Sequence, residues 1–445
     1  MGQITSTPVV ERDDGGAQGD EPAAEVVRPV LDLLLGDHAP VAFEFWDGSR
    51  LDPDGRPVAS IRLTSPNALR RLVWMPNELG LGRAYVAGEL ELEGDVFRAI
   101  ETLRDHANID SRTAWRSMPT FAAAARRLGV LGPPLPPPEE ETRLEGWRHG
   151  LRHSPGRDSR AISHHYDVGN EFYRLVLGPS MTYSCARFAE PAYTLEDAQA
   201  AKHELVCRKL GLHERPGARL LDVGCGWGSM AIHAALHHGA HVVGVTISRE
   251  QADLARHRVA EAGVADRVEI RLQDYRHLAG ESFDAISSIG MSEHVGHRRI
   301  DQYFEVLRGV LRPGGRLLNH AISSVGGSKM GRTSFVGRYV FPDGELIDIG
   351  NVVLAMERAG FEVRDVESLR EHYALTLREW VANLERDWDH AVELVGVARA
   401  RVWRLYMAAS AVGFEDGGIN IHQSLGVLPG PAGHADMPRT RRDWH

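Results

Sequence analysis

The sequence predicts an α/β fold of the Rossmann-like type, joined to a smaller N-terminal α+β domain. Strand-like runs alternate with helical patterns after about residue 145, as they do in doubly wound parallel sheets. One of these runs, Arg219–Val223, ends in Asp-Val and leads through alternate glycines into a helical pattern. The proline-rich stretch Leu131–Glu141 separates this region from the mixed pattern that precedes it.

The N-terminal part of the chain predicts two units. Residues 1–28 are rich in Asp, Glu, Gly and Ala without periodicity, and we expect a disordered acidic tail there. Residues 30–128 predict the α+β domain, which we expect to associate with lipid or membrane. Its pattern indicates strands at Val41–Trp46 and Val58–Leu63 and helices at Asn67–Met75 and Val96–Leu103.

A proline-rich linker is expected at 129–144, a catalytic α/β domain at 145–427 and a flexible Pro/Gly tail at 428–445. The segment from Thr376 to Phe414 has a helical pattern. The expected strands of the α/β domain are Arg219–Val223, His241–Thr246, Val268–Leu272, Phe283–Ile289 and Arg316–Ile322, with a further one at Phe361–Glu367 and a turn at Arg312–Gly315 before the fifth.

Composition excludes several classes of protein. A net charge of −10 argues against a general nucleic-acid binder, so we expect no nucleic-acid partner. The chain has 3 cysteines, which indicates no disulfide framework and favours a reducing compartment. No run of 18 uncharged apolar residues occurs, and the acidic N-terminus lacks the pattern of a signal peptide. We therefore expect a cytoplasmic protein.

The glycine loop after Arg219–Val223 predicts a cofactor site. Gly224 allows the turn, Gly226 lets a ligand approach the backbone, and Gly228 lets the following helix pack on the strand. A dinucleotide fingerprint needs a glycine at position 229, where this chain has Ser. The pattern G-x-G-x-G after an acidic strand end resembles methyltransferases that use S-adenosylmethionine (SAM). Cofactor-binding residues are expected in the loop, at Asp222, Gly224, Cys225, Gly226, Trp227 and Gly228.

Polar residues at the next two strand ends complete the expected cofactor site. The second strand ends without the acid that often grips a ribose, so Thr246 and Gln251 are expected to bind it through neutral hydrogen bonds. Ser248 is a further expected cofactor-binding residue. After the third strand, Gln273, Asp274 and Tyr275 are suited to meet an adenine. Each of these residues could instead be a helix cap or a surface polar group.

Several unusual blocks resemble the cyclopropane-fatty-acyl-phospholipid synthase family, which includes mycolic acid cyclopropane synthases and tuberculostearic-acid-type fatty acid methyltransferases. The blocks are Ser163–Tyr173, Met181–Phe188, Leu221–Gly228, Thr246–Gln251, Gln273–Tyr275, Ser292–Gly296, Asn319–Ile322 and Tyr339–Gly344. They cover roughly residues 145–425 in the family's order. The N-terminal domain resembles the one found in the phospholipid-acting branch.

The resemblance implies a class I SAM-dependent methyltransferase whose acceptor is a cis double bond in a phospholipid acyl chain. Methyl transfer leaves a carbocation, and a base then removes a proton to give a cyclopropane or a methylene branch, which a reductase partner would convert to a methyl branch. In this family the base is attributed to a bound bicarbonate. The matching positions here are Cys185, Glu293, His320, the backbone of Ile322, and Tyr373. Glu293 could instead cap a helix, and Cys185 could be buried packing.

His164, His165 and Tyr166 are tempting as metal ligands, but adjacent histidines on an extended segment point to opposite sides. We expect no metal ion in the site and assign this segment to a lid over SAM, with Tyr183 and Ser184 closer to the cofactor. Two other functions stay open: a methyltransferase acting on a small molecule, and a non-catalytic lipid-binding protein.

An acyl chain must be drawn out of a bilayer, so we expect peripheral association with the inner face of the membrane. Residues 112–128 carry four arginines and no acid, which suits an anionic surface. Arg112, Arg116, Arg126 and Arg127 beside Trp115 and Phe121 form the expected docking face, with the Arg439–Arg442 tail second. The alternative is a connecting helix that packs on its neighbour. A homodimer, and a reductase partner for a methylene-branched product, are left open.

Overall fold

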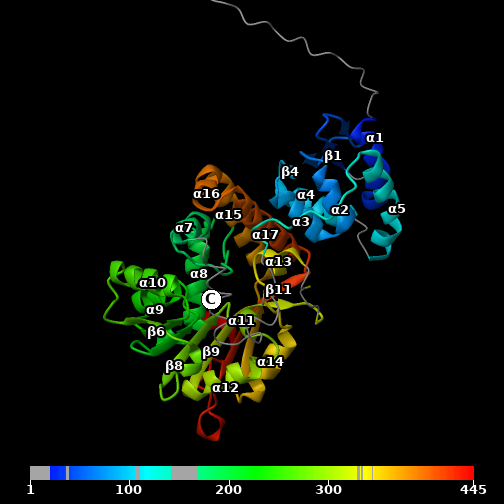
Figure 1. The fold of residues 1–445 in the computed structure, drawn as a ribbon. Helices are drawn as coiled ribbons and strands as arrows, with labels where there is room; N and C mark the ends of the chain where they lie inside the picture. Colours follow the sequence, from blue (N-terminus) through cyan, green and yellow to red (C-terminus); the bar gives the residue numbers. More distant parts are fainter. Residues whose placement is uncertain are drawn as a thin grey trace, which may run out of the picture.

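The computed structural model describes residues 21–36, 40–106, 111–141, 169–327, 331, 334–342 and 344–444. For residues 34, 111–117 and 443 it describes the backbone but not the side chains. Figure 1 shows a small N-terminal domain beside a larger α/β domain, with α13 and α17 between them. The expected lid at His164–Tyr166 lies outside the described residues.

The N-terminal domain is the predicted α+β unit. Its sheet has the order β2-β1-β3-β4, in which β1 and β3 are parallel and the other pairs antiparallel. The strands are β1 (Val41–Glu44), β2 (Arg50–Leu51), β3 (Ala59–Leu63) and β4 (Leu90–Glu93), and the helices are α1 (Ala23–Leu35), α2 (Asn67–Trp74), α3 (Glu78–Val86), α4 (Val96–His106) and α5 (Ser111–Arg127).

Two expectations for this domain are corrected. Helix α1 begins at Ala23 inside the expected acidic tail, because Ala23, Val26 and Val27 are buried in the domain core. Helix α5 packs against α1 and α2, and its Phe121 is 3% exposed in the same core. Phe121 therefore cannot insert into a membrane, and this part of α5 follows the alternative of a helix packed on its neighbours.

The larger sheet has the order β10-β11-β9-β8-β5-β6-β7. Strands β5 to β9 are parallel, and β11 runs antiparallel to both of its neighbours. The bounds are β5 (Arg219–Val223), β6 (His241–Thr246), β7 (Val268–Leu272), β8 (Phe283–Ile289), β9 (Leu311–Ser324), β10 (Glu362–Ser368) and β11 (Ile419–Val427). This arrangement confirms the predicted α/β fold.

The sequence pattern did not predict β11, and β9 begins earlier than the pattern predicts. Strand β9 begins at Leu311, so the expected turn at Arg312–Gly315 lies within the strand, where its register with β8 shifts. Strand β11 contains His422, Gln423 and Gly426, which make a weak strand pattern. It forms because β9 and β10 pair with it on both sides.

Helices cover both faces of the sheet. One face packs against α8 (Leu195–Lys209), α9 (Ser229–His238) and α10 (Arg249–Glu261). The other packs against α12 (Ile300–Val310) and α14 (Ile349–Arg358). The carboxyl ends of the parallel strands are therefore left for a site, as the doubly wound fold requires.

A third cluster of helices lies between the sheet and the N-terminal domain (Figure 1). It contains α7 (Asn170–Leu177), α13 (Phe335–Tyr339), α15 (Arg370–Arg386), α16 (Trp388–Val395) and α17 (Val397–Glu415). The two domains meet here closely. A Cβ at Gly82 would lie 2.4 Å from the ring of Phe335, and Phe335 N donates to Glu78 Oε1 at 3.1 Å.

The C-terminal segment, expected to be a flexible tail, packs on the α/β domain instead. Its last turn, η4 (Arg441–Trp444), places Trp444 at 5% exposure in the core that α8 and α9 share. The indole lies 5.9 Å from the Lys209 ammonium, which pairs with Asp365 at 3.0 Å. Arg441 also pairs with Asp365, so burial and charge together hold this segment.

Candidate functional site

The glycine loop after β5 forms the floor of a pocket. Gly224, Gly226 and Gly228 have φ of 72°, 53° and 83°, a region that favours glycine. A Cβ at Gly224 would lie 2.4 Å from Met291 Sδ, whereas one at Gly226 would meet no described atom within 4 Å. Gly226 faces open space in the pocket, which is where a ligand would approach the backbone.

Most of the expected cofactor residues line this pocket. They are Tyr183, Ser184, Asp222, Gly224, Cys225, Gly226, Trp227, Thr246, Gln251, Gln273, Asp274 and Tyr275. Gly228 and Ser248 are not among the lining residues. A Cβ at Gly228 would touch Ala255 Cβ at 3.4 Å, so its role is to let the loop pack on α10 rather than on a strand. Ser248 caps α10 by accepting a hydrogen bond from Gln251 N at 3.3 Å.

Asp222 presents an unsatisfied carboxylate oxygen at the end of β5. Its Oδ1 accepts a hydrogen bond from Ser287 at 2.7 Å, and Oδ2 is buried without a partner among the described residues. Burial raises the pKa of Asp222 to about 6. A cationic ligand group beside Oδ2 would supply the missing partner.

Sequence reasoning missed the buried Lys202 of α8, which also lines the pocket. Its ammonium donates to Ser184 Oγ at 2.9 Å, and burial lowers its pKa to about 7. No motif marks Lys202, because it lies in a helix that precedes β5. It lies against the pocket only because α8 covers that face of the sheet.

At the ends of β6 and β7 the polar residues are held by one another. Thr246 donates to Gln251 Oε1 at 2.8 Å, and Gln273 Nε2 donates to the His277 carbonyl at 2.9 Å. Burial raises the pKa of Asp274, but hydrogen bonds from Arg276 outweigh it and leave the pKa lowered. Arg276 therefore fixes the Asp274 carboxylate as it faces the expected adenine position.

A second cavity, of about 450 Å³, adjoins the first. Tyr183, Ser184, Gly290 and His294 line both, so the two meet at these residues. Its size lies within the range of ligand pockets. Most of its wall is apolar or aromatic: Val336, Phe341, Leu346, Leu377, Tyr406, Phe414, Ile419 and Ile421. Glu78 of the N-terminal domain closes one side.

Glu293 and His320 are two polar residues that line the second cavity. Glu293, on α11 (Ser292–Val295), accepts a hydrogen bond from Ile322 N at 2.7 Å, and its Oε2 is buried with no described partner. Burial raises the pKa of Glu293 to about 7. The Ile322 amide, expected to bind an anion, is thus used by Glu293.

His320 lines the second cavity with a neutral imidazole. Burial lowers its pKa well below the ordinary value. The Gln423 amide donates to Nδ1 at 3.1 Å, which leaves the ring proton on Nε2. Within the described part of the chain Nε2 is buried without a partner. Gln423 lies on β11, the strand that sequence reasoning missed, and so its role was missed too.

Tyr373 and Cys185 differ in their placement. Tyr373 lines the second cavity with Glu293, His320 and Ile322. Cys185 lines neither cavity: its thiol donates to the carbonyls of Ala186 at 3.1 Å and Leu369 at 3.6 Å. Burial raises the pKa of this thiol. The Cys185 thiol is therefore held in the core, and Cys185 is not among the residues that line the second cavity.

The sheet order, the antiparallel β11 and the pocket over the glycine loop define a class I methyltransferase that uses SAM. The family follows from comparison with known proteins. Residues 153–424 match the family model for mycolic acid cyclopropane synthetase, and the chain belongs to this family.

Two curated proteins and one solved structure show how similar this chain is to other proteins. A probable fatty acid methyltransferase of Mycobacterium tuberculosis is 43% identical over 420 residues, covering 92% of this chain and 95% of its own. The cyclopropane-fatty-acyl-phospholipid synthase of Escherichia coli is 32% identical over 384 residues, covering 86% and 91%. A solved structure of the mycolic acid cyclopropane synthase CmaA1, complexed with SAH and CTAB, has TM-score 0.56 and 34% identity, covering 60% of this chain and 97% of that one.

Proposed function

We propose that this chain transfers the methyl group of SAM to a cis double bond of an unsaturated phospholipid acyl chain, giving a cyclopropane or a methylene-branched product. A methyl branch would require a separate reductase to reduce the methylene-branched product. The observation that carries the proposal is the second cavity. It is apolar along most of its wall, it meets the cofactor pocket at Tyr183 and Gly290, and it gathers Glu293, His320 and Tyr373.

The residues of the first pocket suit SAM, which when bound supplies an electrophilic methyl group on a sulfonium. Gly226 leaves the floor open, and Asp222 Oδ2 offers a buried negative charge to the ammonium. Thr246 and Gln251 offer hydrogen bonds to the ribose, and Asp274 and Tyr275 flank the adenine end. A solved relative complexed with SAH supports this assignment.

The apolar wall of the second cavity has a chemical purpose. Methylation of an alkene leaves a positive charge on the acyl chain, and water would trap it as an alcohol. Phe341, Leu377 and Phe414 exclude water from the part of the cavity that the chain would occupy. A methyltransferase with an oxygen or nitrogen acceptor needs no such wall, which favours the lipid acceptor over a small polar one.

We infer that a bicarbonate ion binds between Glu293, His320 and Tyr373, where when bound it supplies the base that removes the proton. Glu293 and His320 line the same cavity, and each has a buried polar atom without a described partner, Oε2 and Nε2, that such an anion would satisfy. His320 donates from Nε2, and Tyr373 has a hydroxyl that can donate. Protonated Glu293 can also donate, since its pKa lies near neutrality.

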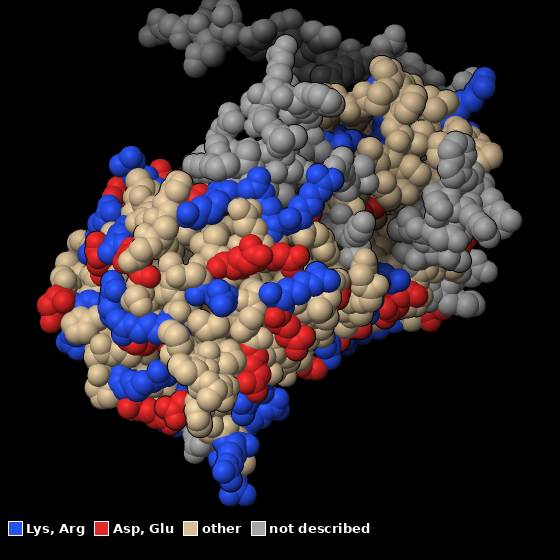
Figure 2. All heavy atoms as spheres, turned by 90° about the horizontal axis from the view of Figure 1, so that it is seen from below, with Lys and Arg blue, Asp and Glu red and all other residues tan. Residues whose placement is uncertain are grey.

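We propose peripheral association with a membrane, since the acyl chain must be shielded during transfer. No helix of the described part of the chain is long and apolar enough to cross a bilayer. On the face seen in Figure 2, basic and acidic side chains are mixed without an extended area of one sign. Arg126 and Arg127 of α5 are exposed, and they remain candidates for contact with anionic lipid.

Lipid analysis tests the proposal directly. The chain would be expressed in a host supplied with oleate, and its phospholipid fatty acids measured by mass spectrometry. The expected result is a gain of one methylene unit in the acyl chains, which is absent with Glu293→Gln. Unchanged fatty acids in cells that contain folded protein able to bind SAH would refute the proposed acceptor. Carbonate-depleted buffer should slow the purified enzyme and added bicarbonate restore it. An unaffected rate would refute the bicarbonate.

A further inference from the structure

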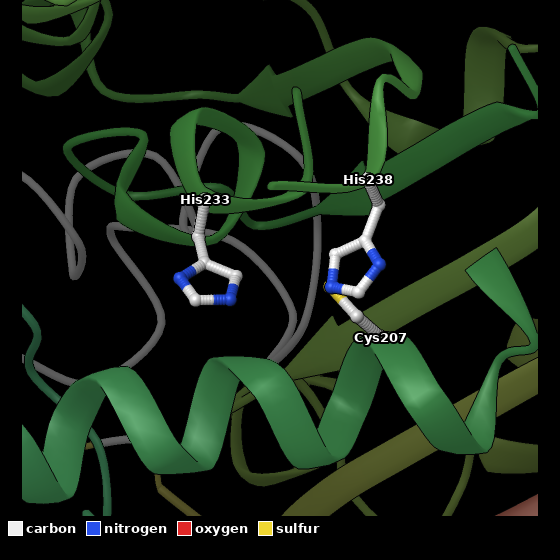
Figure 3. A group of neighbouring side chains, drawn as sticks. All are labelled: Cys207, His233 and His238. Carbon is white, nitrogen blue, oxygen red and sulfur yellow. The ribbon is translucent and has the colours of Figure 1, made fainter. Parts of the chain in front are cut away.

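A cluster of metal-ligating side chains lies outside both cavities, between α8 and α9. Figure 3 shows Cys207 on α8 pointing at His238, with His233 beside it from the preceding part of α9. One donor atom from each, the Cys207 sulfur and a ring nitrogen of either histidine, lies within 4.8 Å of the others. Cys207 is buried, and the side chains of His233 and His238 are 13% and 6% exposed.

A fourth donor, Glu204, lies one turn before Cys207 on the same face of α8. Its Oε2 is 2.9 Å from His238 Nε2 and 3.5 Å from His233 Nε2, so this oxygen lies between the two imidazoles. Arg208 donates to the other oxygen, Oε1, at 2.7 Å, and this contact turns Oε2 toward the histidines. Among the residues described, His233 Nε2 has no hydrogen-bond partner although it is buried.

We propose that Glu204, Cys207, His233 and His238 bind one divalent transition-metal ion, and that zinc is the ion that fits the donor set. One sulfur, two imidazole nitrogens and one carboxylate oxygen are ligands that zinc accepts in tetrahedral sites. Alkaline-earth ions prefer all-oxygen sets, which this cluster does not offer.

The geometry needs only side-chain adjustment. Zinc–sulfur and zinc–nitrogen bonds of about 2.3 and 2.0–2.1 Å place tetrahedral donors roughly 3.3–3.6 Å apart. The sulfur and the two ring nitrogens, within 4.8 Å of one another, must therefore close by up to about 1.5 Å, which rotation of the two histidines supplies. Glu204 Oε2 already lies 2.9 and 3.5 Å from the two Nε2 atoms. Glu204 is 35% exposed and leaves a route from solvent to the cluster.

The position of the cluster gives such an ion a structural consequence. Helix α9 begins at Ser229, immediately after the glycine loop, and α8 carries Lys202 and His203 into the cofactor pocket. An ion held by Cys207 of α8 and His238 of α9 would tie together the two helices that frame one side of that pocket. The site is therefore structural, and it has no part in the chemistry proposed above.

Cobalt binding to the full-length protein, first stripped of metal with a chelator, tests the site independently of activity. Co²⁺ bound by a thiolate gives a charge-transfer band in the near ultraviolet. We expect the band at one ion per chain in the wild type, its loss in Cys207→Ser, and its displacement by Zn²⁺. Zn²⁺ should also raise the Tm of the wild type and leave that of Cys207→Ser unchanged.

The matched control is His257→Ala on α10, which removes an exposed histidine that faces Glu261 at 3.2 Å without a cysteine nearby. It should keep the cobalt band, and SAH affinity should report the fold of each variant. If Cys207→Ser does not fold, His233→Ala replaces it and must lose cobalt binding. No band in the wild type, or a band that survives these substitutions, would show that the cluster is only a hydrogen-bonded His–Glu network.

Discussion

Replacing Glu293 by glutamine should raise stability and lower activity, which is an unusual pair of effects. The substitution keeps the shape and the acceptor for Ile322 N, but it removes a carboxylate that is buried. Burial raises the pKa of Glu293 from 4.5 to about 7. The free energy of unfolding therefore falls as the pH rises from 4.5 to about 7, because the folded state holds the Glu293 proton that the unfolded state has already released.

The magnitude follows from the size of the shift. The pKa of Glu293 rises from 4.5 to about 7, and each pKa unit corresponds to roughly 1.36 kcal/mol. The ionised Glu293 therefore lowers the free energy of unfolding by about 3 kcal/mol above pH 7 and does not lower it below pH 4.5. Glu293→Gln should thus be up to about 3 kcal/mol more stable than the wild type at pH 8 and about equal at pH 4.5. Turnover should fall by roughly 10²–10⁴-fold, as for other acid–base groups.

Urea unfolding of both proteins at pH 4.5 and pH 8, together with turnover on vesicles that contain oleoyl lipids, measures the two effects. Glu305→Gln on the exposed side of α12 is the control, and neither its stability nor its turnover should change. Equal stability differences at both pH values would refute the burial argument. Near-normal turnover would show that Glu293 only caps α11 and holds the Ile322 amide.

Three further predictions test the cofactor floor, the membrane contact and the C-terminal segment. Gly226→Val should abolish SAM binding in calorimetry, whereas Gly239→Val, at a φ of 62° and equally open, should keep it; unchanged SAM affinity in the first would refute the floor. Replacing Arg116, Arg126 and Arg127 by Glu should reduce binding to anionic vesicles without changing SAM affinity, and added salt should reduce vesicle binding of the wild type in the same way. If neither the substitutions nor the salt changes co-sedimentation with vesicles, α5 is excluded as the membrane contact. Trp444→Ala should lower the free energy of unfolding by about 3 kcal/mol or more, and no change would show that the segment is only loosely attached.

Local pattern predicted the elements whose burial is nearly continuous. Strands β5, β6 and β8 have the predicted bounds, because a parallel strand covered on both faces is a mostly buried run that ends at a polar or glycine-rich turn. The edge strand β7 also has its predicted bounds, and its alternating Val, Glu, Ile, Arg and Leu give the period-2 pattern of a half-buried strand. Strand β11 could not be predicted in this way, because its His422 and Gln423 are polar and its partners are distant in sequence. The start of helix α1 was not predicted, because the residues around it have the same acidic and alanine-rich composition as the tail that precedes it.

The sequence by itself determined the cofactor loop and the class of enzyme, since alternate glycines at 224, 226 and 228 follow an acidic strand end, and each has a positive φ that favours glycine. Only the tertiary structure decided what the other polar residues do. In the folded chain the Cys185 thiol donates to a carbonyl, the Ile322 amide donates to Glu293, and the Gln423 amide donates to His320. The tertiary structure also joined Cys207 of one helix to two histidines of the next. Such roles depend on which way a side chain points and on its distance from water, and neither is encoded in the spacing of residues along the chain.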